Sequence, residues 1–181
     1  MRHRRSIRLK DYDYSQEGVY FATICIQNRQ CLLGYVQDGT MFLSHAGEMV
    51  KSVWMDLPNR FDHILLVEFV VMPNHIHGII IIHRRGESCI RPNSSMGDQK
   101  DRPYGTEPDS IGRIIQAFKS ITTNKHIWGV REKKWPAFPN RLWQRNYYEH
   151  IVRNEKELHN LREYVANNPT NWAEDEENPD K

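Results

Sequence analysis

Two histidines, His75 and His77, have the residue type and spacing of a metal-ligand pair. They lie in the stretch MPNHIHG, between apolar runs at residues 64–71 and 79–82. Residues two apart on a β-strand point to the same face, so the two imidazoles project side by side while Ile76 faces the other way. Imidazole nitrogens are common metal ligands. The spacing therefore predicts two ligands on one strand, and two surface histidines on a solvated strand face are the alternative.

Tyr164 and Asn168 form a second candidate pair near the end of the chain. A helix is predicted from Asn154, which with Glu157 makes an Asn-x-x-Glu start close to a capping box, to about residue 167, before Pro169. Residues four apart lie on one helical face. If this helix packs near the histidine strand, Asn168 can offer a carbonyl oxygen as third ligand while Tyr164 presents a phenol. A rim tyrosine and a C-capping asparagine are the alternatives.

The composition is that of a globular domain in a reducing compartment. The chain has 181 residues, 39% of them hydrophobic and 27% charged, and we expect one domain over residues 1–172 with an acidic tail at 173–181. The apolar runs are too short to cross a bilayer, and the basic N-terminus has no apolar segment behind it. Three cysteines without a CxxC pattern suit a reducing cytosol, so a cytoplasmic location is expected.

Charge is distributed unevenly along the sequence. The tail carries five acids and one lysine, and the remaining residues have a net charge of +6. Five basic residues lie in the first ten positions, Arg4 and Arg5 among them. A basic body with a basic arm favours a polyanionic partner, and a solvated charged surface is the alternative. The tail itself is expected to be a disordered, solvating end.

The order of predicted elements indicates an α+β fold. Strands are expected at residues 19–28, 63–71 and 75–82, a hairpin at 31–43 around Asp38-Gly39, and helices at 44–57, 111–125 and 154–167. Adjacent strands with short turns imply an antiparallel sheet with helices packed on one face. Residues 84–110 are broken by glycine, proline and serine, which predicts a mobile loop that is either a substrate loop or a tolerated insertion.

Basic and aromatic residues are interleaved in the second half of the chain. The predicted helix at 111–125 offers Arg113, Lys119 and Lys125 to phosphates, and the following connector leads to Trp143 and Arg145. Bases of single-stranded nucleic acid stack on aromatic rings beside such cations. The alternative is that the tryptophans cover an edge of the sheet.

Four motifs in order resemble one known family. They are MPNHIHG at residues 72–78, IQAFKS at 115–120, LWQRNYYEH at 142–150 and YVANNP at 164–169. With them the chain resembles the single-tyrosine HUH transposases, and most closely the REP-associated tyrosine transposases, over roughly residues 10–172. The resemblance implies a ferredoxin-like (RRM-like) α+β fold.

The resemblance also implies a chemistry. Tyr164 would be the nucleophile that attacks a single-stranded DNA phosphodiester, with a divalent metal, Mg²⁺ or Mn²⁺, on His75 and His77. The third ligand falls on Asn168, an amide where a carboxylate would bind more strongly. The substrate would be single-stranded or hairpin DNA. Family members occur as monomers and as dimers whose sites are completed by the partner's helix, so a homodimer stays open.

Rival interpretations remain at this stage. Tyr147 and Tyr148 are alternative nucleophiles because they lie close to basic residues. The protein could instead be a relaxase-type nickase, a non-catalytic single-strand binder on the same fold, or a zinc hydrolase. A hydrolase would want a carboxylate base beside the histidines, and the nearest upstream acid, Glu68, is seven residues from His75. The acidic tail could also mimic DNA at the site.

Overall fold

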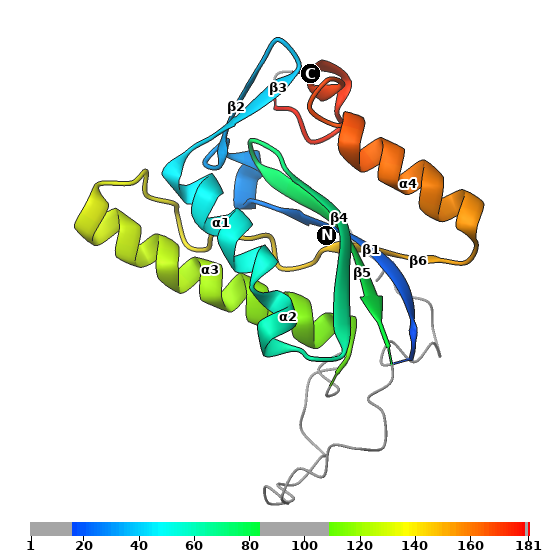
Figure 1. The fold of residues 1–181 in the computed structure, drawn as a ribbon. Helices are drawn as coiled ribbons and strands as arrows, with labels where there is room; N and C mark the ends of the chain where they lie inside the picture. Colours follow the sequence, from blue (N-terminus) through cyan, green and yellow to red (C-terminus); the bar gives the residue numbers. More distant parts are fainter. Residues whose placement is uncertain (1–15, 84–108, 180) are drawn as a thin grey trace, which may run out of the picture.

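A four-stranded antiparallel sheet forms the centre of the molecule. The computed structural model describes residues 16–83, 109–179 and 181. Strands are arranged in the order β4-β5-β1-β6, and Figure 1 shows the sheet between helices. Their bounds are Gly18–Cys25 for β1, Ile64–Val71 for β4, His75–Ile82 for β5 and Tyr148–Val152 for β6.

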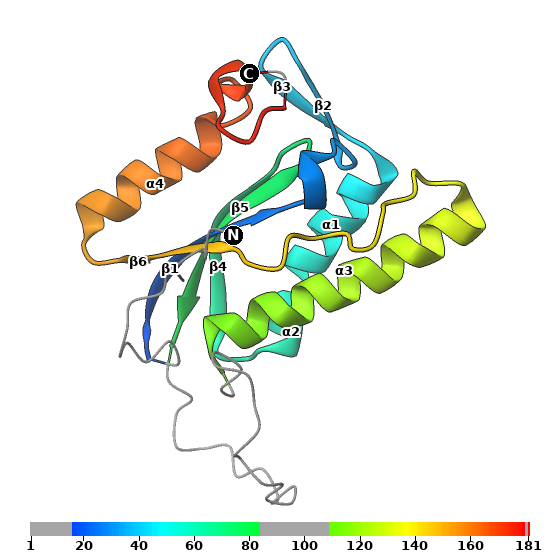
Figure 2. The ribbon, with the colours of Figure 1, turned by 180° about the vertical axis from the view of Figure 1, so that it is seen from behind.

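Side chains alternate between the two faces of the sheet. On one face, Ile76 of β5 lies opposite Ile24 of β1 in the main core. Helices α1 (His45–Met55) and α3 (Ile111–Lys133) cover that face. On the other face, His77 lies opposite Thr23, and α4 (Glu155–Asn167) packs across β4 and β5. Figures 1 and 2 show α4 on the side of the sheet away from α1 and α3.

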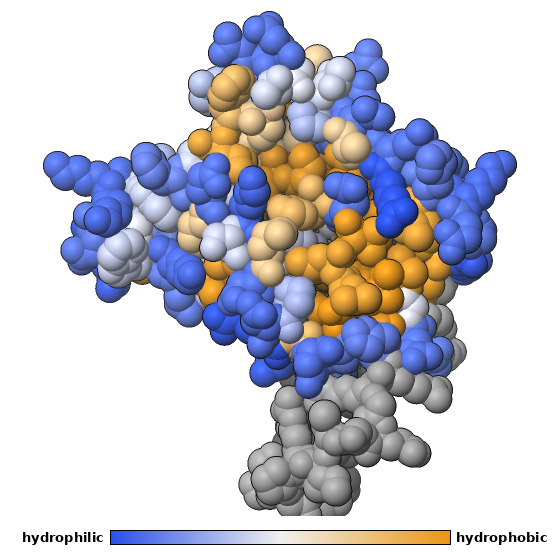
Figure 3. Space-filling model, in the orientation of Figure 1, coloured by the Kyte–Doolittle hydropathy of each residue, from blue (hydrophilic) through white to orange (hydrophobic). Residues whose placement is uncertain are grey.

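This arrangement confirms the α+β class and the antiparallel sheet, and it differs from the prediction in one respect. The prediction had the helices on one face, whereas α4 forms a third layer. The physical reason is that β5 is buried on both faces, with Ile79 packed against Val165 of α4 in a second, smaller core. Figure 3 shows apolar side chains still gathered on the sheet next to α4, where Val67 and Val70 are only partly buried.

The local elements follow the sequence closely, with two differences. Strands β2 (Gly34–Gln37) and β3 (Thr40–Leu43) form the expected hairpin, and Ser44 caps α1 by accepting from the Gly47 amide. Helix α3, however, runs eight residues beyond the predicted end at residue 125. Strand β6 was not predicted, because it is only five residues long and is specified by pairing with β1. Two 3₁₀ turns, Gln27–Arg29 and Trp172–Glu174, and the short α2 (Leu57–Arg60) complete the described part.

Some predictions fall outside the described residues. These are the basic arm with Arg4 and Arg5, and the loop at 84–110 apart from its last two positions. None of the described helices is long and apolar enough to span a membrane.

Gly78, directly after the histidine pair, is required by the core beneath it. A Cβ at this position would lie 2.1 Å from Cζ2 of Trp54, a fully buried ring of α1. We expect Gly78→Ala to lower the free energy of unfolding by about 1–3 kcal/mol through overpacking, measured by urea denaturation.

The control for this prediction is Trp54→Phe, which removes the benzo ring that a Cβ would meet. In the double variant, the cost of Gly78→Ala should fall. An unchanged cost in the double variant would contradict the packing argument.

Candidate active site

The histidine pair lies on β5 as the spacing predicted, on the face that α4 covers. The His75 side chain is fully buried and His77 is 4% exposed. Their Nε2 atoms are 3.0 Å apart, and the ring centroids are 4.5 Å apart. The two rings therefore direct the same nitrogen of each imidazole toward one point.

The other ring nitrogens are held by neighbouring side chains. His75 Nδ1 lies 2.9 Å from Oδ1 of Asn74, and His77 Nδ1 lies 2.8 Å from Oγ1 of Thr23 on β1. The Asn74 amide donates from Nδ2 to the carbonyl oxygens of Arg29 and Glu177, so its Oδ1 must accept from His75. This arrangement fixes the proton of His75 on Nδ1 and leaves a lone pair on Nε2, which is how proteins orient metal-binding histidines.

Burial keeps both imidazoles neutral at physiological pH. Desolvation lowers the pKa of His75 to about 3. The pKa of His77 is also lowered to about 3, chiefly by burial and further by its proximity to His75. A neutral imidazole is the form that binds metal, so neither ring has to lose its second proton near pH 7 before it can act as a ligand.

Helix α4 places Tyr164 above this pair. The Tyr164 hydroxyl lies 3.4 Å from His77 Nε2, and the ring packs edge-on against His77 and Phe21. The histidines and the tyrosine therefore meet within one chain. The rivals are placed differently: Tyr148 contacts Phe21 from β6, and the Tyr147 ring lies under the Lys119 ammonium.

Asn168 stays on the helical path despite the proline that follows it. Its backbone has helical dihedrals (φ −58°, ψ −41°), so it remains one turn beyond Tyr164. The side chain is 3% exposed and interacts with both His75 and Tyr164. Its Oδ1 is buried and finds no hydrogen-bond donor in the described part of the chain. A buried acceptor without a donor is costly, so this oxygen has the character of an unused ligand atom.

The acidic tail supplies a carboxylate that the sequence did not reveal. Oδ2 of Asp175 lies 3.9 Å from His75 Nε2, and ligand atoms of His75, His77 and Asp175 lie within 4.8 Å of one another. The tail was expected to be a disordered, solvating end, but it folds back against the histidines because Glu177 pairs with Arg29 at 3.0 Å. Nothing in the sequence distinguishes Asp175 from the other four acids of the tail.

These atoms fit a divalent cation. The ligand atoms of His75, His77 and Asp175 lie within 4.8 Å of one another. Asn168, whose buried Oδ1 has no donor among the described residues, interacts with His75. Mixed nitrogen and oxygen donors suit Mn²⁺ better than Ca²⁺, and carboxylate and carbonyl oxygens also suit Mg²⁺.

Tyr164 itself is held in its protonated form. Burial raises the pKa of the phenol above its ordinary value, and the carboxylate of Asp175 raises it further, although the interaction with Asn168 lowers it. The tail acids therefore disfavour the phenolate in the DNA-free protein. A cation bound beside the phenol would oppose both effects.

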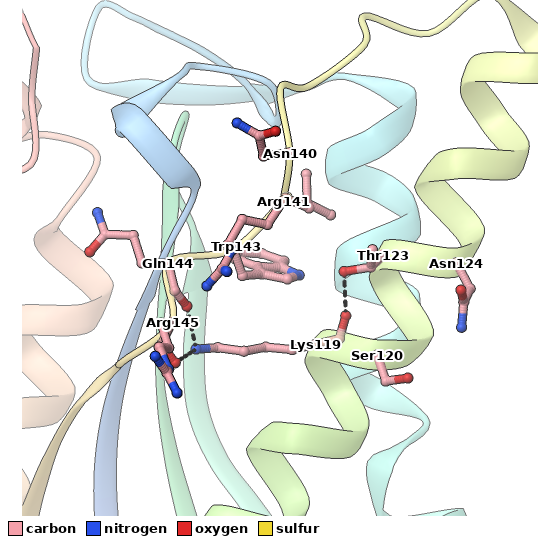
Figure 4. A pocket seen from close by; sticks show the side chains of 10 residues that line it. Lys119, Ser120, Thr123, Asn124, Asn140, Arg141, Trp143, Gln144 and Arg145 are labelled. Carbon is pink, nitrogen blue, oxygen red and sulfur yellow. Dashed lines mark hydrogen bonds between the residues drawn. The ribbon is translucent and has the colours of Figure 1, made fainter.

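The residues predicted to bind DNA are spread over different environments. Lys119, Trp143 and Arg145 line an open cavity of about 360 Å³ between α3 and the segment before β6. Figure 4 shows Lys119 extending from α3 toward the carbonyl of Gln144. The Trp143 ring is 4% exposed and donates from Nε1 to Thr122, so it is not available as a stacking platform here.

The other two helix cations lie away from the histidines. Arg113 and Lys125 are exposed on α3, which packs against α1 on the opposite face of the sheet from α4. Lys125 lines a second cavity with residues of α1 and with Asp56, which directly follows that helix. These two cations are therefore remote from the histidine pair and Tyr164.

The Lys119 ammonium is bound by backbone carbonyls of its own chain, which indicates a role in stability. Its ammonium donates to the carbonyl oxygens of Gln144, Arg145 and Asn146 at 2.9–3.5 Å, and burial lowers its pKa to about 8. We expect Lys119→Met to lower the free energy of unfolding by about 1–3 kcal/mol, because three carbonyls lose a charged donor. Thermal and urea denaturation measure this loss.

Arg145→Met is the matched control, since Arg145 is exposed beside the same cavity. It should change stability by no more than about 0.5 kcal/mol and weaken binding of single-stranded DNA. The reverse pattern, with Lys119→Met stable and defective in DNA binding, would make Lys119 a direct DNA contact.

Two proteins of Haemophilus influenzae are similar to this chain in sequence. An uncharacterised Haemophilus influenzae protein is 42% identical over 175 residues, which cover 96% of this chain and 92% of that protein. A second H. influenzae protein, provisionally assigned as a REP-associated tyrosine transposase, is 22% identical over 157 residues (87% and 73% of the two chains).

The fold is also found in a solved structure. A REP-associated tyrosine transposase bound to a REP hairpin aligns with a TM-score of 0.56 at 19% identity, over 92% of this chain and 73% of that one. No family model matches the sequence. The chain therefore belongs to one family with the 42% identical Haemophilus protein, and its fold is that of the REP-associated tyrosine transposases, the single-tyrosine HUH transposases that its sequence resembles.

Proposed function

We propose that this protein is a metal-dependent transesterase that cleaves and rejoins single-stranded DNA through a tyrosine. The observation that carries the proposal is the position of the Tyr164 hydroxyl, 3.4 Å from His77 Nε2 in a site whose other members are metal-ligand types. The similarity to REP-associated tyrosine transposases supports a DNA-processing enzyme of the transposase type.

Tyr164 performs the bond exchange in this proposal. Its oxygen attacks the phosphorus of a DNA phosphodiester, the bond from phosphorus to the 3′ oxygen breaks, and a 5′-phosphotyrosine link forms. The phenol loses one proton and the released 3′ oxygen gains one, so the step is balanced. Because the phosphotyrosine keeps the ester bond, a second 3′-hydroxyl can reverse the exchange without ATP.

The metal site supports this exchange. His75, His77 and Asn168 would hold a divalent ion, Mg²⁺ or Mn²⁺, which supplies Lewis-acid stabilisation of the non-bridging phosphate oxygens. Asn74 and Thr23 keep the two imidazoles in the orientation that directs Nε2 to the site. Phe21 packs against both the His77 and Tyr164 rings and so restricts where the phenol can move.

The proposed substrate is single-stranded DNA next to a hairpin. The structurally similar transposase is bound to a REP hairpin. The exposed cations Arg113, Lys125 and Arg145 provide sequence-independent contacts to phosphates. Weaker binding at higher salt is therefore expected.

The test is a cleavage assay on end-labelled hairpin DNA with a single-stranded flank and Mn²⁺. The expected product is a protein–DNA adduct that resists SDS and carries the label of the 5′-phosphate side. A wild-type protein that binds such DNA and forms no adduct on hairpins of varied flank sequence would favour the alternative, a non-catalytic single-strand binder on the same fold. The raised pKa of Tyr164 favours that alternative, because it disfavours the phenolate that would act as the nucleophile.

A further inference from the structure

We propose that Asp175, carried by the C-terminal tail, is a fourth protein ligand of the metal, and that Asn74 positions it together with His75. This inference rests on the proposed metal site and goes beyond it. The structure brings a carboxylate 98 positions after His77 to within 3.9 Å of His75 Nε2. The Asp175 side chain is only 7% exposed. Four other acids lie in the same tail.

The carboxylate is oriented by its own backbone. Oδ1 of Asp175 accepts the amide of Glu177 at 2.6 Å. Oδ2 is therefore the oxygen directed at the histidine pair. A carboxylate held through one oxygen presents the other as a single, defined ligand atom, which reduces the entropy lost when an ion binds.

The tail is anchored on both sides of Asp175. Before it, Trp172 lies over the His75 ring at a centroid distance of 6.1 Å. After it, the Glu177 carboxylate pairs with Arg29, and the buried Asn178 donates from Nδ2 to the Trp172 carbonyl. These contacts close the tail into a compact turn, so the position of Asp175 is set by several independent interactions.

Asn74 couples that turn to the histidines. One end of its amide accepts from His75 Nδ1, and the other donates to the Glu177 carbonyl at 2.7 Å. The same side chain thus fixes the direction of His75 Nε2 and the position of the segment that carries Asp175. Asn74 is 1% exposed and is a positioning residue, since it reaches the site only through its neighbours.

A carboxylate ligand changes which metal ions the site binds best. Two neutral imidazoles and a neutral amide add no charge, whereas Asp175 adds one negative charge to balance a divalent cation. Oxygen anions favour hard ions such as Mn²⁺ and Mg²⁺. An ion that takes six ligands would still have positions open for phosphate oxygens.

The test measures Mn²⁺ binding to the full-length, DNA-free protein by isothermal titration calorimetry and by EPR of free Mn²⁺. Asp175→Asn keeps the size and the Oδ1 acceptor and removes the charge. Glu176→Gln is the matched control, because Glu176 is an exposed acid of the same tail. We expect Asp175→Asn to weaken Mn²⁺ binding by about 10-fold or more, the scale found when metal-site partners are removed, and Glu176→Gln to weaken it by less than about 3-fold. Asn74→Ala should weaken Mn²⁺ binding as well.

The outcomes separate this inference from the proposed function. Equal losses in Asp175→Asn and Glu176→Gln would overturn direct ligation and leave only a long-range effect of charge. Unchanged Mn²⁺ affinity in Asp175→Asn would also overturn the inference. If His77→Asn loses Mn²⁺ affinity in the same titration, the proposed metal site on the histidines still stands. Adduct formation by Tyr164 is scored in the separate cleavage assay, so the nucleophile can fail without affecting this result.

Discussion

Tyr164→Phe is expected to abolish the covalent adduct, with a fall of at least about 10³-fold in its rate of formation. Phenylalanine keeps the ring that packs against His77 and Phe21 and removes only the hydroxyl that the proposal makes the nucleophile. Because the hydroxyl lies 3.4 Å from His77 Nε2, a long hydrogen-bond distance, and its other interaction among the described residues is with the side chain of Asn168, stability should be little changed. Denaturing gels with labelled hairpin DNA and Mn²⁺ measure the adduct.

The controls for this substitution are the two neighbouring tyrosines. Tyr148→Phe and Tyr147→Phe should retain adduct formation, because Tyr148 contacts Phe21 from the edge strand and Tyr147 packs under Lys119. DNA affinity of Tyr164→Phe, measured by fluorescence anisotropy, should stay within a few-fold of wild type. A Tyr164→Phe protein that still forms the adduct would show that another residue is the nucleophile.

Removal of the proposed metal ion is the second change with a large expected effect. Chelation with EDTA, or His77→Asn, should slow adduct formation by about 10²–10⁴-fold, since Lewis-acid stabilisation is worth several kcal/mol and each 1.36 kcal/mol is tenfold in rate. His77 is the better position for substitution than His75, because the partner of His75, Asn74, also holds the Glu177 segment of the tail.

Two measurements control this prediction. Mn²⁺ added back after EDTA should restore the wild-type rate and leave His77→Asn slow. Circular dichroism should show that His77→Asn remains folded. Full activity of the wild type in excess EDTA would contradict metal dependence and would leave the histidines with a role in positioning Tyr164.

Local sequence determined much of this protein. Alternation in β5 placed His75 and His77 on one face, because side chains of a strand alternate whatever packs on them. Helical spacing placed Tyr164 and Asn168 together, and the cap at Asn154 marked the helix start, where its side chain accepts from the Glu157 amide. These features depend on neighbours in the chain, so pattern alone can reveal them.

Only the tertiary structure decided the rest. The side of the sheet that α4 covers follows from β5 being apolar on both faces, and β6 exists only through its pairing with β1. The sequence pattern predicts Lys119 and Trp143 as DNA contacts. In the fold, Lys119 donates to backbone carbonyls and Trp143 donates to the Thr122 hydroxyl. Asp175 reaches the histidines because Glu177, two residues on, forms an ion pair with Arg29 and accepts a hydrogen bond from Asn74, which lies 103 positions earlier in the chain. Such contacts have no local period, and therefore no signature in the sequence of a single chain.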